Sequence, residues 1–162
     1  MDHTPTPAAT TSPAPTAAQT PRGFATISYW AHDVPAAAAW YAQVLGVAPY
    51  FARAMPGEED PAYCEFRFGD YQQELGVIDR RFAPATFTAA PGGAVVYWHV
   101  DDVPGTFARL LAMGATAVEG PQDRGRGFVT ASVVDPFGNV FGVMYNPHYV
   151  AVRGTRPPVG PA

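Results

Sequence analysis

Apolar and polar residues follow the same order in the two halves of the chain. Alternation predicts strands over 24–31 and 94–100, and each strand is followed by an Asp-Val-Pro motif, at Asp33 and, 69 residues later, at Asp102. A carboxylate here accepts backbone N–H groups of a first helical turn, and proline fits that turn because its missing N–H costs little there. The pattern therefore predicts helices over 36–45 and 103–113.

Each predicted helix has one apolar face and ends at a glycine. The faces have helical spacing and consist of Trp40, Tyr41, Val44 and Leu45 in the first helix and Phe107, Leu110 and Leu111 in the second. Gly46 and Gly114 stand where a left-handed residue ends a helix.

Three further strands follow each helix. The first half predicts strands near 48–53, 62–68 and 71–78, with a hairpin at Gly69-Asp70, and the second predicts 115–119, 127–134 and 140–146. The last two are joined by a turn at 135–139, and the 121–127 loop, with Gly125 and Gly127, is expected to be mobile. Each half thus reads as β-α-β-β-β, a repeat that predicts one domain made of two similar modules.

The domain is bounded by segments of different composition. Residues 1–22 are rich in Ala, Thr and Pro and predict a disordered tail, and residues 151–162 predict a flexible one. The folded domain is expected over 23–150, with modules at 23–81 and 93–150 and a linker at 82–92. The segment 145–149 after the last strand is expected to fold over the rim of a pocket.

Composition excludes several classes of protein. The net charge is −4, and all 10 basic residues are arginine. Because they form no run and nucleic-acid binding needs clustered basic charge, a nucleic-acid partner is not expected. Without lysine there is no Schiff-base site or Walker-type phosphate loop. The lone Cys64 excludes an intramolecular disulfide, and no stretch is long and apolar enough for a membrane span. We expect a cytoplasmic protein without a cofactor.

The duplicated order, together with Trp40-Tyr41-x-x-x-Leu45-Gly46 and Asp135-Pro136-x-Gly138-Asn139, resembles the vicinal oxygen chelate superfamily. This superfamily includes glyoxalase I, extradiol dioxygenases, fosfomycin-modifying enzymes and bleomycin resistance proteins. The resemblance covers about 24–147 and implies an α+β fold in which two βαβββ modules form a curled mixed-sheet cup. It does not imply one reaction, because a fold does not define a function.

The resemblance also implies four positions that hold the metal ligands of the metal-dependent members. Counting from the motifs puts them at Thr26, Glu74, Val95 and Gly142. One carboxylate cannot supply the three or more donors of a catalytic metal site. We therefore expect no metal and neither glyoxalase nor dioxygenase activity.

The alternation of side chains then predicts which residues line the cup. The expected ligand-binding residues are Thr26, Ser28, Trp30, Gln72, Glu74, Tyr97, His99 and Met144. Glu74 has two interpretations: a carboxylate with a raised pKa that serves a ligand, or a structural ion pair with Arg67. His99 is either an acid–base partner of Glu74 or a hydrogen-bonded residue at a strand end.

Two functions follow from this lining. The first is a binding protein that sequesters an apolar or aromatic ligand, as bleomycin resistance proteins do, and so gives antibiotic resistance. The second is a metal-independent isomerase or lyase with Glu74 and His99 as its catalytic acid and base. The expected partners are a small molecule and, on the resemblance alone, a second copy of the chain in a homodimer.

Overall fold

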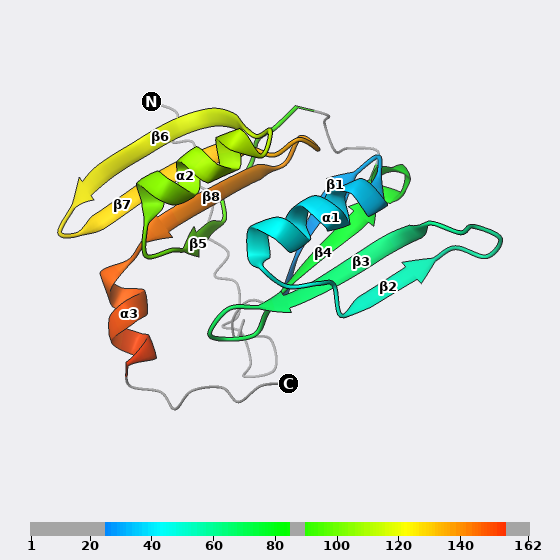
Figure 1. Cartoon of the computed structure of the whole chain (residues 1–162), viewed down its shortest axis with the longest axis horizontal. Helices are drawn as coiled ribbons and strands as arrows, with labels where there is room; N and C mark the ends of the chain where they lie inside the picture. Colours follow the sequence, from blue (N-terminus) through cyan, green and yellow to red (C-terminus); the bar gives the residue numbers. More distant parts are fainter. Residues whose placement is uncertain (1–24, 85–89, 155–162) are drawn as a thin grey trace, which may run out of the picture.

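The computed structural model describes residues 25–84 and 90–154. The expected tail at 1–22 and most of the expected tail at 151–162 lie outside these ranges. The described chain forms two four-stranded mixed sheets, each with its own helix (Figure 1). This arrangement confirms the fold class expected from the sequence.

The first module contains one helix and four strands. They are β1 (Thr26–Ala31), α1 (Val34–Leu45), β2 (Phe51–Ala54), β3 (Pro61–Phe68) and β4 (Gln73–Asp79). The strand order is β1-β4-β3-β2, and β1 runs parallel to β4 because α1 carries the chain back across the sheet. A single 3₁₀ turn, Arg80–Phe82, follows β4.

The second module repeats this topology. It consists of β5 (Tyr97–His99), α2 (Val103–Ala112), β6 (Thr116–Gly125), β7 (Phe128–Val134) and β8 (Val140–Tyr145), in the order β5-β8-β7-β6. β5 is again parallel to β8. A short helix, α3 (Pro147–Arg153), follows β8 and extends three residues beyond the boundary expected at 150.

Local capping explains where the two longer helices begin and end. Asp33 accepts a hydrogen bond from the backbone N–H of Ala36, and Asp102 accepts one from Gly105. Gly46 ends α1 in the left-handed conformation, with φ of 73°. The capping residues named from the sequence are thus confirmed for α1, and the aspartate cap is confirmed for α2.

Two strands of the second module differ in length from the sequence prediction. β5 contains only Tyr97–His99, rather than 94–100, because only these residues lie in register with β8 at the edge of the sheet. β6 extends through Gly125, whereas 121–127 was expected to be a loop. Pro121 is tolerated because β6 is an edge strand whose register with β7 shifts at several points.

One helical position also differs. Leu111 was assigned to the buried face of α2, but it is 37% exposed, while Leu110 is fully buried. The buried face of α2 includes Val103 and Leu110, which lie two turns apart.

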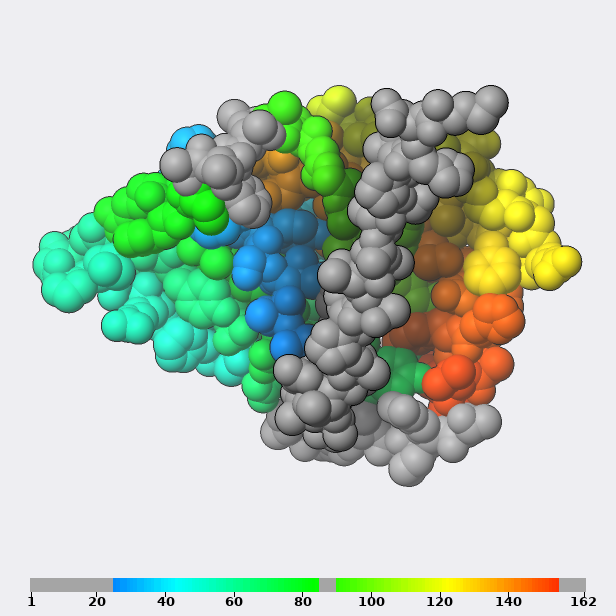
Figure 2. Space-filling model, turned by 180° about the vertical axis from the view of Figure 1, so that it is seen from behind, coloured from blue at the N-terminus to red at the C-terminus, as the bar shows by residue number. Residues whose placement is uncertain are grey.

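The two modules share one hydrophobic core. α1 packs on β3 and β4, and α2 packs on β6, β7 and β8. Buried side chains of both modules belong to one cluster, and Tyr41, fully buried, contacts Phe66 of its own module and Phe141 of the other. The modules therefore form one folding unit, and Figure 2 shows them side by side from the face opposite that of Figure 1.

Tyr29, Trp40 and Tyr41 of the first module donate hydrogen bonds to the second module. The indole N–H of Trp40 donates to the carbonyl of Met113 at 2.8 Å, and the Tyr29 hydroxyl donates to the carbonyl of Val140 at 3.2 Å. The Tyr41 hydroxyl donates to the buried carboxylate of Asp135. No helix in the described ranges is long and apolar enough to cross a membrane.

Candidate functional site

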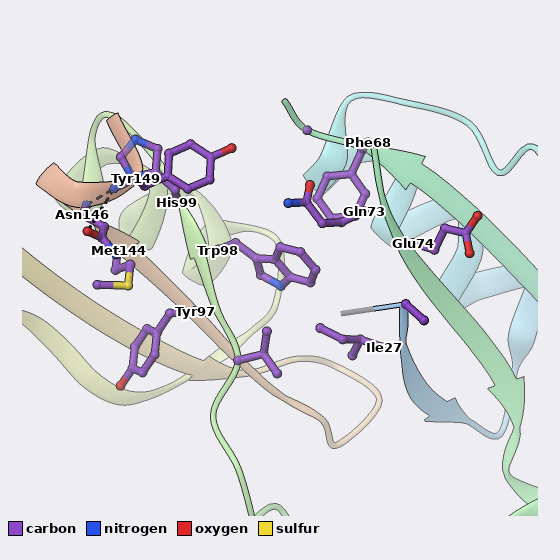
Figure 3. Close-up of a pocket in the computed structure, with 13 residues that line it drawn as sticks. Ile27, Phe68, Gln73, Glu74, Tyr97, Trp98, His99, Met144, Asn146 and Tyr149 are labelled. Atoms are coloured by element: carbon purple, nitrogen blue, oxygen red, sulfur yellow. Dashed lines mark hydrogen bonds between the residues drawn. The ribbon is translucent and has the colours of Figure 1, made fainter. Parts of the chain in front are cut away.

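A cavity of about 270 Å³ lies between the two modules. It is bordered by the start of β1, the β3–β4 hairpin, β5, the end of β8 and α3 (Figure 3). The residues that line it are Ala25, Ile27, Phe68, Gly69, Gln73, Glu74, Val96, Tyr97, Trp98, His99, Met144, Asn146 and Tyr149. Its size is near the lower end of the range for small-molecule pockets, which is roughly 300–1,000 Å³.

The floor of the cavity is aromatic and joins the modules. Phe68 at the end of β3 meets Trp98 of β5, with ring centroids 4.9 Å apart and the ring planes tilted by 54°. Ile27 of β1 points toward Trp98 from below in Figure 3. A flat apolar ligand that enters the cavity therefore packs against side chains of both modules. Small-molecule pockets commonly form at such interfaces between structural units.

His99 borders the cavity at the base of α3. Its ring stacks on Tyr149, with centroids 4.4 Å apart and planes 17° apart, and its Nδ1 accepts a hydrogen bond of 3.1 Å from the backbone N–H of Asn146. An Nδ1 that accepts carries no proton, so the neutral ring has its proton on Nε2, an assignment made from the hydrogen bond. Nε2 lies 3.5 Å from the carboxylate of Asp101.

The helix α3 is attached to the opposite module through one carboxylate. The Tyr149 hydroxyl donates to Asp70 at 3.1 Å, and Nε of Arg153 lies 3.0 Å from the same carboxylate. Burial, followed by the neighbouring Asp70, raises the pKa of Tyr149 to about 12, so this hydroxyl keeps its proton. Asp70 belongs to the β3–β4 hairpin, and α3 thus connects the hairpin to β8 across the cavity mouth.

Glu74 borders the cavity, but its carboxylate points away from it and forms an ion pair (Figure 3). Its carboxylate lies 2.5 Å from a guanidinium nitrogen of Arg67 and accepts a hydrogen bond of 3.2 Å from Tyr50. The hydrogen bond from Arg67 lowers the pKa of Glu74, which therefore stays ionised. Of the two interpretations of Glu74, the structure contains the ion pair, and Figure 3 shows its carboxylate pointing away from Trp98 and His99.

The structure brings together half of the residues expected to line the site. Glu74, Tyr97, His99 and Met144 border the cavity. Ser28 and Trp30 instead border a second hollow of about 230 Å³, which Asn139 also lines.

Thr26 and Gln72 border neither hollow. Thr26 pairs with Glu74 in the ladder between β1 and β4. Gln72 has a φ of 53°, and its side-chain amide donates to the carbonyl of Gly69 at 3.4 Å. Among the described residues, no hydrogen bond or ion pair joins Glu74 to His99.

Sequence reasoning missed several residues that form the cavity. Gln73 and Trp98 were not named because alternation assigned them to the opposite face of their strands, and Phe68 was not named because its strand was not assigned to the cup. The cavity lies at the ends of the sheets, where β5 is short and an edge strand, so both faces of these strands contribute to it. The segment 145–149 was expected at a pocket rim, and its Tyr149 does border the cavity.

The sheet registers define how the two modules correspond. Ser28 lies opposite Gly76, and Tyr97, its counterpart 69 residues later, lies opposite Gly142. The counterpart of Gly142 in the first module is therefore Gly76, two residues after Glu74. A Cβ at Gly76 would come within 3 Å of Tyr63, and a Cβ at Gly142 would come within 3 Å of Tyr97.

Comparison with known proteins identifies the family. Residues 23–143 match the model of the Glyoxalase/Bleomycin resistance protein/Dioxygenase superfamily. With two βαβββ modules and a cavity between them, the chain has the architecture of this class of proteins. The chain belongs to this superfamily, and no curated protein sequence matches it.

Solved structures show the same fold at low sequence identity. A glyoxalase-related enzyme from Fulvimarina pelagi is 21% identical, with a TM-score of 0.61 over 78% of this chain and 89% of that one. TioX from Micromonospora sp. ML1 is also 21% identical, with a TM-score of 0.56 over 76% and 98%. A glyoxalase/bleomycin resistance protein from Catenulispora acidiphila is 19% identical, with a TM-score of 0.52 over 76% and 98%. At these identities the likeness shows the fold alone.

Proposed function

We propose that this protein binds one small apolar or aromatic molecule in the cavity between its modules and holds it unchanged, as a sequestering protein would. The observation that carries the proposal is the composition of the cavity wall. Phe68, Trp98 and Ile27 supply apolar surface from both modules, while polar groups are few. Sites of this kind bind apolar ligands and use the polar groups for orientation.

The residues at the family's metal positions favour binding over metal chemistry. Thr26, Val95 and Gly142 offer no strong ligand, and the carboxylate of Glu74 is engaged by Arg67. If Gly76, the register counterpart of Gly142, is taken as the metal position in place of Glu74, the set contains no carboxylate at all. Within 25–84 and 90–154, no three His, Cys, Asp or Glu side chains group closely enough to hold a metal ion.

The arrangement of Glu74 and His99 does not favour the acid–base alternative. A general acid and a general base must both come within hydrogen-bond reach of one ligand. The Glu74 carboxylate instead points away from the cavity and has a lowered pKa, which makes it a weaker base. We also propose a homodimer, on the grounds of family membership.

The first test combines metal analysis with ligand screening. We would measure the metal content of dialysed protein and its melting temperature with Zn²⁺, Mn²⁺, Ni²⁺ and Fe²⁺, and then screen aromatic compounds by calorimetry. The proposal expects no stoichiometric metal, no stabilisation by metals, and saturable binding of a compound that mass spectrometry recovers unchanged. A ligand at about 100 times its Kd should stabilise the protein by about 2.7 kcal/mol.

Two matched tryptophan variants test whether the ligand binds in the cavity or elsewhere. Trp98→Phe should weaken binding about tenfold, because a large part of the aromatic wall is lost. Trp30→Phe is the control, since Trp30 occupies the comparable first strand but borders the other hollow. Bound metal with stabilisation, conversion of the ligand, or equal effects of the two variants would contradict the proposal.

A further inference from the structure

The side-chain amide of Gln73 lies at the cavity and has no hydrogen-bond partner within 25–84 and 90–154. Gln73 begins β4 opposite Phe68, and Figure 3 shows its amide directed toward β5 and Tyr149. Its neighbour Gln72, by contrast, does not line the cavity and donates to the carbonyl of Gly69.

Gly69 makes room for this amide. A Cβ at position 69 would lie 2.9 Å from Oε1 of Gln73, and the φ of 74° there favours glycine in any case. The amide oxygen thus rests against the bare backbone of the hairpin. Both the oxygen and the NH₂ group stand at the edge of the aromatic floor formed by Phe68 and Trp98.

The described residues that line the cavity include no lysine or arginine. The one imidazole among them, His99, is in its neutral form when its Nδ1 accepts from the N–H of Asn146. The two nearby arginines are committed elsewhere, Arg67 to Glu74 and Arg153 to Asp70. An anionic ligand would lose its hydration without gaining a counter-charge, which is strongly unfavourable.

From these observations we infer that the cavity selects an uncharged, planar ligand with an amide-like edge, in which an N–H and a C=O lie side by side. The amide of Gln73 presents one donor and one acceptor side by side, so it can pair with such an edge through two hydrogen bonds. The ring of the ligand packs against Phe68 and Trp98. This inference rests on the proposed binding function and adds the chemical class of the ligand and the residue that recognises it.

The test uses small bicyclic probes that differ only at this edge. Their dissociation constants would be measured by calorimetry for 2-quinolone, which has the lactam edge, for 1-methyl-2-quinolone, in which the N–H is blocked, and for quinoline-2-carboxylate, which is anionic. We expect 2-quinolone to bind about tenfold more tightly than the methylated probe, since one buried hydrogen bond is lost and an acceptor is left unpaired. The carboxylate should bind at least as weakly as the methylated probe.

Neighbouring glutamines supply matched variants. Gln73→Met keeps the length of the side chain and removes the amide, so it should abolish the preference for 2-quinolone and leave the affinity for the methylated probe within about twofold. Gln72→Met is the control and should keep the preference. Methionine is unbranched like glutamine and therefore adds little strain at the φ of 53° of position 72.

The outcomes separate this inference from the proposed function. If both quinolones bind equally, if the preference survives in Gln73→Met, or if the carboxylate binds most tightly, the ligand class is wrong while binding itself stands. If no aromatic compound binds in the preceding screen, the proposed function fails and the inference fails with it.

Discussion

At the scale of single residues, the role of a carboxylate depends on the side chain that it contacts. Glu74 lies directly opposite Arg67 in the ladder between β3 and β4. A cross-strand pair of opposite charge on an exposed face stabilises the charged form of both groups. Glu74 is therefore an ionised structural group in this fold, and the sequence alone left that choice open.

The Glu74–Arg67 pair predicts a lowered titration midpoint. In a ¹³C NMR titration, the Glu74 carboxyl should have a midpoint below the ordinary value of 4.5, and Arg67→Met should return it toward that value. Because the folded-state pKa is the lower one, the pair stabilises the protein above pH 4.5, and this contribution disappears as the pH falls through the folded-state pKa. The control is Arg53→Met on β2, and a wild-type midpoint at or above 4.5 would contradict the assignment.

At the scale of secondary-structure elements, α3 depends on contacts outside itself. A helix of seven residues is too short to be stable alone. Asn146 caps it by accepting from the N–H groups of His148 and Tyr149, and Asp70 holds it from the other module. The cavity mouth is therefore bounded by an element of low intrinsic stability.

Removing the charge of Asp70 should loosen α3 without unfolding the domain. Asp70→Asn weakens the contacts with both Tyr149 and Arg153. We expect the amides of Val150 and Gly154 to exchange hydrogen about tenfold faster, which corresponds to about 1.4 kcal/mol of local stability. Asp60→Asn, in the loop before β3, is the control. Unchanged exchange in α3 would show that Asp70 does not anchor it.

At the scale of the whole molecule, the modules are coupled through Asp135. This carboxylate is 3% exposed and accepts hydrogen bonds from the hydroxyl of Tyr41, from the backbone N–H groups of Phe137 and Asn139, and from the amide of Asn139. Asn139 also bonds the backbone of Trp30 in the first module through both ends of its amide. The Asp-Pro-x-Gly-Asn turn therefore fixes β8 against β1 and α1.

Substitutions in this network should destabilise the whole domain. Asp135→Asn replaces an accepting oxygen by an NH₂ group that faces other hydrogen-bond donors, and it should lower the free energy of unfolding by about 2–3 kcal/mol. Tyr41→Phe removes one hydrogen bond and should lower this free energy by about 1 kcal/mol. Urea denaturation, followed by circular dichroism and fluorescence, should give one transition for both variants because the core is shared. Asp123→Asn, in an exposed hairpin, is the control. Two separate transitions would mean that the modules unfold independently.

The sequence predicted the elements well because their signals are local. Asp33, Pro35 and Gly46 specify the ends of α1 within one short segment, and the same signals recur at α2. The lengths of β5 and β6 were missed because strand ends depend on pairing with residues far along the chain. Alternation likewise misplaced Trp98 and Gln73, since it assumes a sheet with two separate faces and the cavity lies at the sheet ends.

What the sequence determined by itself is the double βαβββ order, the family resemblance that follows from it, and the residue types at the family's metal positions. These depend on the identity and spacing of neighbouring residues. The tertiary structure alone decided that Arg67 neutralises Glu74, that α3 meets Asp70, and that the amide of Gln73 is directed toward β5 and Tyr149. These contacts join residues from different elements, and only the packing of the two modules brings them together.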